Sequence, residues 1–154
     1  MKSKSVCFTG HRNMAPGDIP IIREKLKEAI ELHIEKGFTE FYNGGARGFD
    51  LLSAEVVLSL RELYPHIRLH IIVPCKGQTR GWQEDDISRH ESIISSADEV
   101  RVLSPFYFNG CMQIRNRHMV DASSVCIAFV REPRGGSADT AEYAEKQGLQ
   151  VVYL

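Results

Sequence analysis

Short apolar runs alternate with longer amphipathic stretches along almost the whole chain of 154 residues. Runs of this kind, rich in β-branched and aromatic residues, are typical of buried strands, whereas apolar residues spaced three and four apart are typical of helices. Strands that alternate with helices favour a parallel sheet covered on both faces. We therefore predict an α/β fold of the Rossmann-like, doubly wound type, with a mainly parallel sheet and a single domain over residues 1–154.

The expected element boundaries follow from glycine and proline positions as much as from periodicity. Pro20 suits the first turn of a helix, Gly37 and Gly148 suit helix ends, and Pro65 stops the helix before it. The predicted strands are 5–9, 38–42, 69–73, 99–103, 124–130 and 150–154, and the predicted helices are 20–36, 50–63, 82–96, 112–121 and 137–147.

Two glycine-rich segments, 43–50 and 134–140, each follow a predicted strand and open a predicted helix. Glycine lets the backbone turn sharply and approach an anion, and a helix that begins just beyond offers free N–H groups. A third turn, at Gly10 and Arg12, follows the first strand. All three lie at carboxyl ends of strands, hence on one edge of the sheet, where doubly wound proteins bind ligands. The candidate ligand-binding residues are Gly10, Arg12, Gly44, Gly45, Gly48, Asp50, Trp82, Arg115, Asn116, Gly135, Gly136, Ser137 and Thr140.

Several of these side chains have two open interpretations. Arg12 is either a bidentate partner for phosphate or an ordinary surface arginine. Asp50 is either a helix N-cap or an acceptor for ribose hydroxyls. Trp82 either stacks on a base or anchors its helix in the core. Glu142 is either a partner of the helix dipole or a carboxylate that takes part in catalysis.

Composition and motifs argue against several functions. The segment 44–48 lacks the lysine and hydroxyl residue of an ATP-hydrolysing P-loop and does not fit GxGxxG. A formal net charge of −1 makes nucleic acid an unlikely partner, although local basic pockets remain open. No apolar run is long enough to cross a membrane, and no histidine or cysteine spacing suggests a metal. Four scattered cysteines suit a reducing cytoplasm. No motif in the sequence indicates a cofactor.

The order and spacing of these segments resemble the SLOG superfamily, a Rossmann-like group that includes the LOG and DprA proteins, and most of all its YpsA-like branch of unknown function. The resemblance implies a pocket for a nucleotide-derived ligand. LOG enzymes cleave the N-glycosidic bond of nucleoside 5′-monophosphates, which implies Arg115 and Glu142 as a catalytic pair. Gln113 and Asn116, however, stand where the LOG helix motif MHxRKxxM has His and Lys. The resemblance also suggests a homodimer.

These observations lead to three hypotheses. The first is a cytoplasmic sensor or regulator that binds a small nucleotide or another phosphorylated, nucleotide-derived ligand. The second is a LOG-like phosphoribohydrolase in which Arg115 holds the 5′-phosphate and Glu142 stabilises the ribosyl cation. The third is a protein-interaction scaffold with a vestigial pocket.

Overall fold

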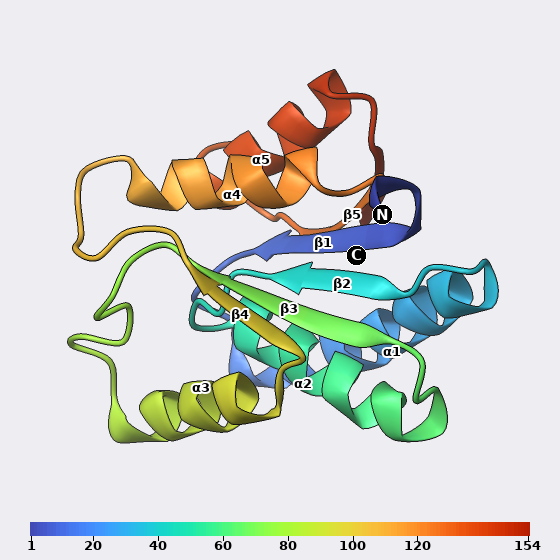
Figure 1. Ribbon diagram of the computed structural model, residues 1–154, viewed down its shortest axis with the longest axis horizontal. Coiled ribbons are helices and arrows are strands. Elements are labelled where there is room, and N and C mark those ends of the chain that lie inside the picture. Colours follow the sequence, from blue (N-terminus) through green and yellow to red (C-terminus); the bar gives the residue numbers. More distant parts are fainter.

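Six parallel strands form one continuous sheet in the computed structural model, which describes residues 1–154 (Figure 1). Their order across the sheet is β4-β3-β2-β1-β5-β6. The strands are β1 Ser5–Gly10, β2 Glu40–Asn43, β3 Arg68–Val73, β4 Glu99–Val102, β5 Val125–Phe129 and β6 Gln150–Tyr153. All five strand pairings are parallel, so the predicted α/β fold is confirmed and the sheet is parallel throughout.

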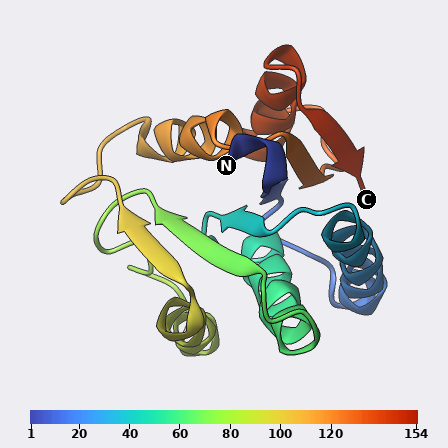
Figure 2. The same cartoon turned by 45° about the vertical axis from the view of Figure 1, so that its right-hand side comes forward.

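Helices cover both faces of the sheet (Figures 1 and 2). One face carries α1 Ile19–Glu35, α2 Phe49–Leu63 and α3 Glu84–Ser96, and the other carries α4 Cys111–Asp121 and α5 Gly136–Lys146. Short 3-10 helices span Lys2–Lys4 and Pro16–Asp18. The expected elements all form. The main differences are that β2 begins at Glu40 rather than at residue 38, and that α3 begins at Glu84 rather than at Trp82.

The two faces bury apolar side chains unequally. The face under α1, α2 and α3 holds a cluster of 22 buried hydrophobic residues, and the face under α4 and α5 holds a cluster of nine. Strand alternation divides the side chains between them: Val6 and Phe8 belong to the larger cluster, whereas Cys7 belongs to the smaller one. Every cysteine is a buried free thiol.

The strand order reverses beside β1, which pairs with β2 on one side and with β5 on the other. The chain runs outward from β1 through β2, β3 and β4, and then returns through α4 to β5 on the opposite side. The loops after β1 and β5 therefore separate at this point and leave a crevice at the carboxyl edge of the sheet.

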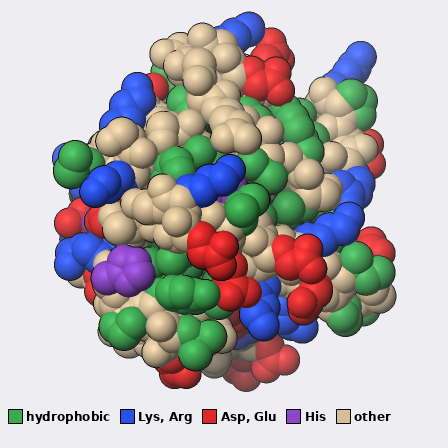
Figure 3. Space-filling model, turned by 90° about the vertical axis from the view of Figure 1, so that its right-hand side faces the viewer, with side chains coloured by type: hydrophobic (Ala, Val, Ile, Leu, Met, Phe, Trp, Pro, Cys, Tyr) green, Lys and Arg blue, Asp and Glu red, His purple; other side chains and the backbone are tan.

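The opposite edge of the sheet, where the strands begin, is seen face-on in Figure 3. Acidic and basic side chains are interspersed over this surface, and neither sign gathers into a large patch. No helix of the protein is both long enough and apolar enough to span a bilayer.

Candidate functional site

A cavity of about 380 Å³ lies at the point where the strand order reverses. Its walls come from the end of β1 and the loop after it, from the turn between β2 and α2, from the loop between β4 and α4 together with the first turns of α4, and from the start of α5. The lining residues are Phe8, Thr9, Gly10, His11, Arg12, Ala46, Asp50, Tyr107, Asn109, Gly110, Met112, Gln113, Arg115, Asn116, Gly136 and Ser137. We call this cavity the switch-point pocket.

Arg12 gives the pocket a cation with no partner in the protein. Its side chain is exposed and takes part in none of the ion pairs of the molecule. The first residues of α5, Gly136 and Ser137, line the same pocket. Because the first N–H groups of a helix have no intrahelical acceptor, they are available to an anion, as is the positive end of the helix dipole.

His11 orients the serine at the start of α5. The backbone N–H of Arg131 donates to His11 Nε2 at 2.7 Å, so this nitrogen is the acceptor. A neutral ring then carries its proton on Nδ1, which lies 3.1 Å from Ser137 Oγ and donates to it. Ser137 therefore keeps its own hydroxyl hydrogen free to donate into the pocket.

Asp50 and Arg115 form the buried floor of the pocket. They are 6% and 3% exposed, respectively. Burial raises the pKa of Asp50 to about 6, although Arg115, the backbone N–H of Ala46 and Arg12 all favour its ionised form. Burial also lowers the pKa of Arg115, and the attraction of Asp50 opposes this shift. A carboxyl group that titrates near pH 6 and a permanent cation thus sit side by side beneath Arg12.

Arg115 is largely committed to the protein itself. Its Nη1 donates to the carbonyl oxygens of Gly44 and Ile72, at the ends of β2 and β3, and its Nε donates to Asn116 Oδ1 at 2.8 Å. These bonds tie α4 to the carboxyl edge of two strands. Arg115 therefore contributes positive charge to the pocket, while most of its N–H donors serve the scaffold.

The first glycine turn, which the sequence suggests as a source of backbone N–H donors for a ligand, satisfies two of these N–H groups within the protein. The N–H of Gly45 donates to Asn43 Oδ1 at 2.8 Å, and the N–H of Ala46 donates to Asp50 Oδ2 at 3.2 Å. The Asn43 amide in turn donates to the Asp50 carbonyl and to Ser53 Oγ. Asp50 thus closes the turn through one oxygen.

Three glycines are explained by close packing between these loops. A Cβ on Gly10 would lie 2.3 Å from the Phe49 ring, and one on Gly48 would lie 2.2 Å from the carbonyl oxygen of Arg12. A Cβ on Gly44 would meet the Arg115 guanidinium at 2.5 Å. Gly48 also has a φ of +76°, which residues with a side chain rarely adopt. The glycines thus let the loops after β1 and β2 and the α4 arginine come together.

The structure brings seven of the predicted site residues into the switch-point pocket. They are Gly10, Arg12, Asp50, Arg115, Asn116, Gly136 and Ser137. The remaining candidates, which do not line it, are Gly44, Gly45, Gly48, Trp82, Gly135, Thr140 and Glu142.

Trp82 and Glu142 lie away from this pocket for different reasons. Trp82 packs against the larger core cluster, and its ring lies edge-on to His90 and beneath the Arg47 guanidinium. Glu142 is 63% exposed, pairs with Lys146 at 2.9 Å and lines a neighbouring groove between α4 and α5. The inferred pair of Arg115 and Glu142 therefore does not converge on one cavity. Thr140 also faces the groove, and its hydroxyl donates to the Gly136 carbonyl.

Sequence reasoning does not single out the individual residues by which the loop between β4 and α4 lines the pocket. Tyr107, Asn109 and Gly110 line the pocket from this loop, and Tyr107 is 65% exposed. The sequence marks the loop as an irregular segment able to cover a pocket, but its aromatic residue carries no signal of direction. His11, another lining residue that is not among the predicted ones, has a structural role through its bonds to Arg131 and Ser137.

Comparison with known proteins places the chain in one family. The model of the YspA SLOG family matches residues 6–153. A UPF0398 protein of Halalkalibacterium halodurans is 30% identical over 138 residues, which cover 88% of this chain and 73% of that protein. A UPF0398 protein of Bacillus thuringiensis is 29% identical over 156 residues, covering 94% and 84% of the two chains.

Among solved structures, two DNA processing proteins share the fold. The DNA processing protein A of Helicobacter pylori, described for its single-stranded DNA binding mode, aligns with a TM-score of 0.67 and 19% identity. The alignment covers 99% of this chain and 65% of that one. DprA of Streptococcus pneumoniae aligns with a TM-score of 0.68 and 16% identity, covering 98% and 50%. This chain therefore spans half to about two thirds of the length of these neighbours.

The Helicobacter pylori neighbour overturns the expectation that nucleic acid is an unlikely partner. That expectation rested on the net charge of −1, which is a sum over the whole chain. Cations paired within the surface, such as Arg89 with Glu55, cancel in this sum. The unpaired Arg12 at the pocket is a local feature that the sum does not reveal.

Proposed function

We propose that this chain, which belongs to the YspA SLOG family, binds a nucleotide through its phosphate in the switch-point pocket. The observation that carries the proposal is the convergence of the unpaired Arg12 with the first turn of α5 in one cavity. Guanidinium groups and free helix N–H groups both favour phosphate. The volume of about 380 Å³ lies within the usual range for small-molecule sites.

The pocket offers a different environment to each part of a nucleotide. The phosphate is proposed to lie against Arg12, Ser137 and the first N–H groups of α5. Asp50, on the floor, keeps one carboxyl oxygen outside the turn that it closes and can accept a bond from a ribose hydroxyl. The exposed ring of Tyr107 stands at the rim, where it can stack on a base.

Arg12→Gln tests this function directly. The substitution removes the cation but keeps a polar, shorter side chain that can still donate a hydrogen bond. We expect the affinity for nucleoside 5′-monophosphates to fall by about 10- to 150-fold, the equivalent of roughly 1.5–3 kcal/mol for a hydrogen bond to a charged group. Isothermal titration calorimetry with AMP, GMP, CMP and UMP measures the loss, and the corresponding nucleosides show whether the phosphate is needed.

Arg134→Gln is the matched control. Arg134 is an exposed arginine directly before Gly135, and it does not line the pocket. Its replacement changes the net charge equally and should leave affinity unchanged. Equal losses in the two variants, or nucleosides that bind as tightly as nucleotides, would contradict the proposed phosphate site. Assaying the same samples for free base separates binding from hydrolysis.

Single-stranded nucleic acid is a second candidate ligand, favoured by the described binding mode of the Helicobacter pylori neighbour. A strand presents the same phosphate groups as a free nucleotide, so Arg12 suits both. Fluorescence anisotropy with a labelled thymidine 12-mer, with and without competing mononucleotide, distinguishes the two. Strand binding that mononucleotides cannot displace and that Arg12→Gln does not weaken would place any strand site elsewhere on the molecule.

A further inference from the structure

A second cavity, of about 420 Å³, lies on the other side of Arg12. The first two turns of α1, α2 and α3 border it, and Met14, Ile19 and Leu52 supply apolar surface. Arg12 lines both this cavity and the switch-point pocket. Gly48 also lines the second cavity, and its backbone packs against the Arg12 carbonyl. The two cavities are therefore separated by little more than the Arg12 segment.

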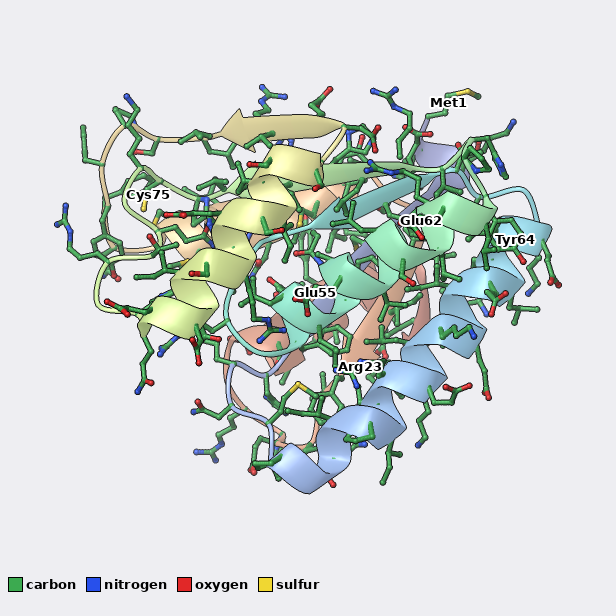
Figure 4. All side chains as sticks on the ribbon, turned by 90° about the horizontal axis from the view of Figure 1, so that it is seen from below. Met1, Arg23, Glu55, Glu62, Tyr64 and Cys75 are labelled. Atoms are coloured by element: carbon green, nitrogen blue, oxygen red, sulfur yellow. The ribbon has the colours of Figure 1, made fainter.

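The charged groups of the second cavity are unevenly paired. Arg89 engages both oxygens of Glu55, at 2.6 and 3.0 Å, and lies 3.5 Å from Asp86. The two carboxylates of the cavity are thus both held by one cation. Arg12 and Arg23 remain, and neither takes part in an ion pair. Figure 4 shows Arg23 between α1 and α2, and Glu55 at the end of α2 that lies beside α3.

From this arrangement we propose that Arg23 and Arg12 form a second anion site, which takes a further phosphate group linked to the nucleotide in the switch-point pocket. The inference rests on the proposed function and extends it to ligands with at least two phosphates. Arg12, shared by both cavities, lies between the two phosphates, and Arg23 binds only the second. The second phosphate belongs either to a phosphodiester-linked nucleotide or to a nucleoside diphosphate.

Three ligand series distinguish these sources. The probes are the four deoxynucleoside 5′-monophosphates, the four 5′-diphosphates, and the four 5′-phosphorylated homodinucleotides. For the unmodified protein we expect at least one two-phosphate series to bind about 10-fold more tightly than its monophosphates, because a second charged hydrogen bond forms. The series that gains affinity identifies the linkage between the phosphates.

Arg23→Gln should abolish this gain while leaving monophosphate affinity unchanged. Arg23→Lys should retain most of it, because the charge remains. The control is Lys25→Gln on the same helix, since Lys25 lines a different groove near Leu154. For a dinucleotide, Arg23→Gln should also lower the slope of log affinity against log salt by about 0.7, the value for one phosphate contact on a single strand.

The outcomes separate the two proposals. If monophosphates bind but no two-phosphate ligand binds more tightly, or if the gain survives Arg23→Gln, the second anion site is wrong and the proposed function stands. If Lys25→Gln removes the gain as fully as Arg23→Gln, the effect is one of general surface charge, which also overturns the site. If no nucleotide of any series binds, the proposed function itself fails.

Discussion

Two opposing effects act on the pKa of the Asp50 carboxyl group. Burial disfavours its charge, while Arg115, the Ala46 N–H and Arg12 favour it, and burial prevails to give a pKa of about 6. The same carboxyl closes the first glycine turn and faces the proposed ligand. Its protonation state therefore changes within the range of pH at which binding is studied.

Asp50→Asn should change how stability depends on pH. Because the pKa of Asp50 is raised from 3.8 to about 6 on folding, its proton favours the folded state. That stabilisation is fully present below the unfolded pKa of 3.8 and is lost as pH rises through about 6. Relative to Asp50→Asn, the unmodified protein should gain about 2 kcal/mol between pH 7 and pH 4, most of the full effect of the shift at roughly 1.36 kcal/mol for each pKa unit. Urea unfolding of both proteins across this range measures the difference, and parallel curves would contradict the shift.

At the level of single residues, the sequence predicts which residues lie at the carboxyl edge of the sheet better than it predicts where their side chains point. Arg12 and Ser137 follow strands at the correct edge, and both line the pocket as expected. Trp82 lies in a loop at the same edge, but its ring turns toward the core and His90. Tyr107 faces the pocket from a loop with no periodicity. Side-chain direction in a loop depends on tertiary packing, which a local pattern does not contain.

At the level of elements, the loop after β1 and the start of α2 are locked together at Gly48. The Phe49 N–H donates to the His11 carbonyl at 3.1 Å, and Gly48 packs against the Arg12 carbonyl. Two neighbouring strands of the sheet thus present their loops as one unit. Arg12 owes its position between the two cavities to this contact.

Gly48→Ala should destabilise the protein by about 2–6 kcal/mol, because the unfavourable backbone conformation and overpacking each add roughly 1–3 kcal/mol. The added Cβ would lie 2.2 Å from backbone atoms that cannot move aside cheaply. Gly17→Ala is the control, since no atom lies within 4 Å of the position that its new methyl group would occupy. Urea denaturation gives both free energies of unfolding. A loss of less than about 1 kcal/mol in Gly48→Ala would show that the loops separate without strain.

The elements themselves are predictable because their signals are local. Helix α1 repeats its apolar residues at helical spacing and ends beside Gly37, and the central strands are short apolar runs between turns. The predicted element boundaries are wrong where tertiary contacts determine the local structure. The sequence favours Phe38 as the start of a strand, but its ring lies edge-on to His33 and packs beside the core before β2 begins.

For the whole molecule, the unequal cores predict unequal resistance to local opening. Helix α2 buries nine residues, whereas α5 buries Thr140, Ala141 and Ala144. The free energy of local opening rises with the apolar contacts that must be broken. The face that carries α4 and α5 should therefore open before the face that carries α1 and α2.

Native-state hydrogen exchange tests this order. Amides in the middle of α5 should exchange faster than those in the middle of α2, under conditions in which exchange reports the opening equilibrium. A saturating nucleotide should slow exchange in α5 more than in α2, because α5 begins at the proposed phosphate site. Equal protection of the two helices without ligand would contradict the proposed difference between the faces.

The internal hydrogen bonds of the first glycine turn have a thermodynamic consequence for recognition. Asn43 and Asp50 hold the turn, and Arg115 and Gln78 both donate to the Gly44 carbonyl. This side of the pocket is thus preorganised before any ligand arrives. The turn therefore loses little conformational entropy when a ligand binds. More of the favourable contact energy then appears as binding affinity, even for a small ligand.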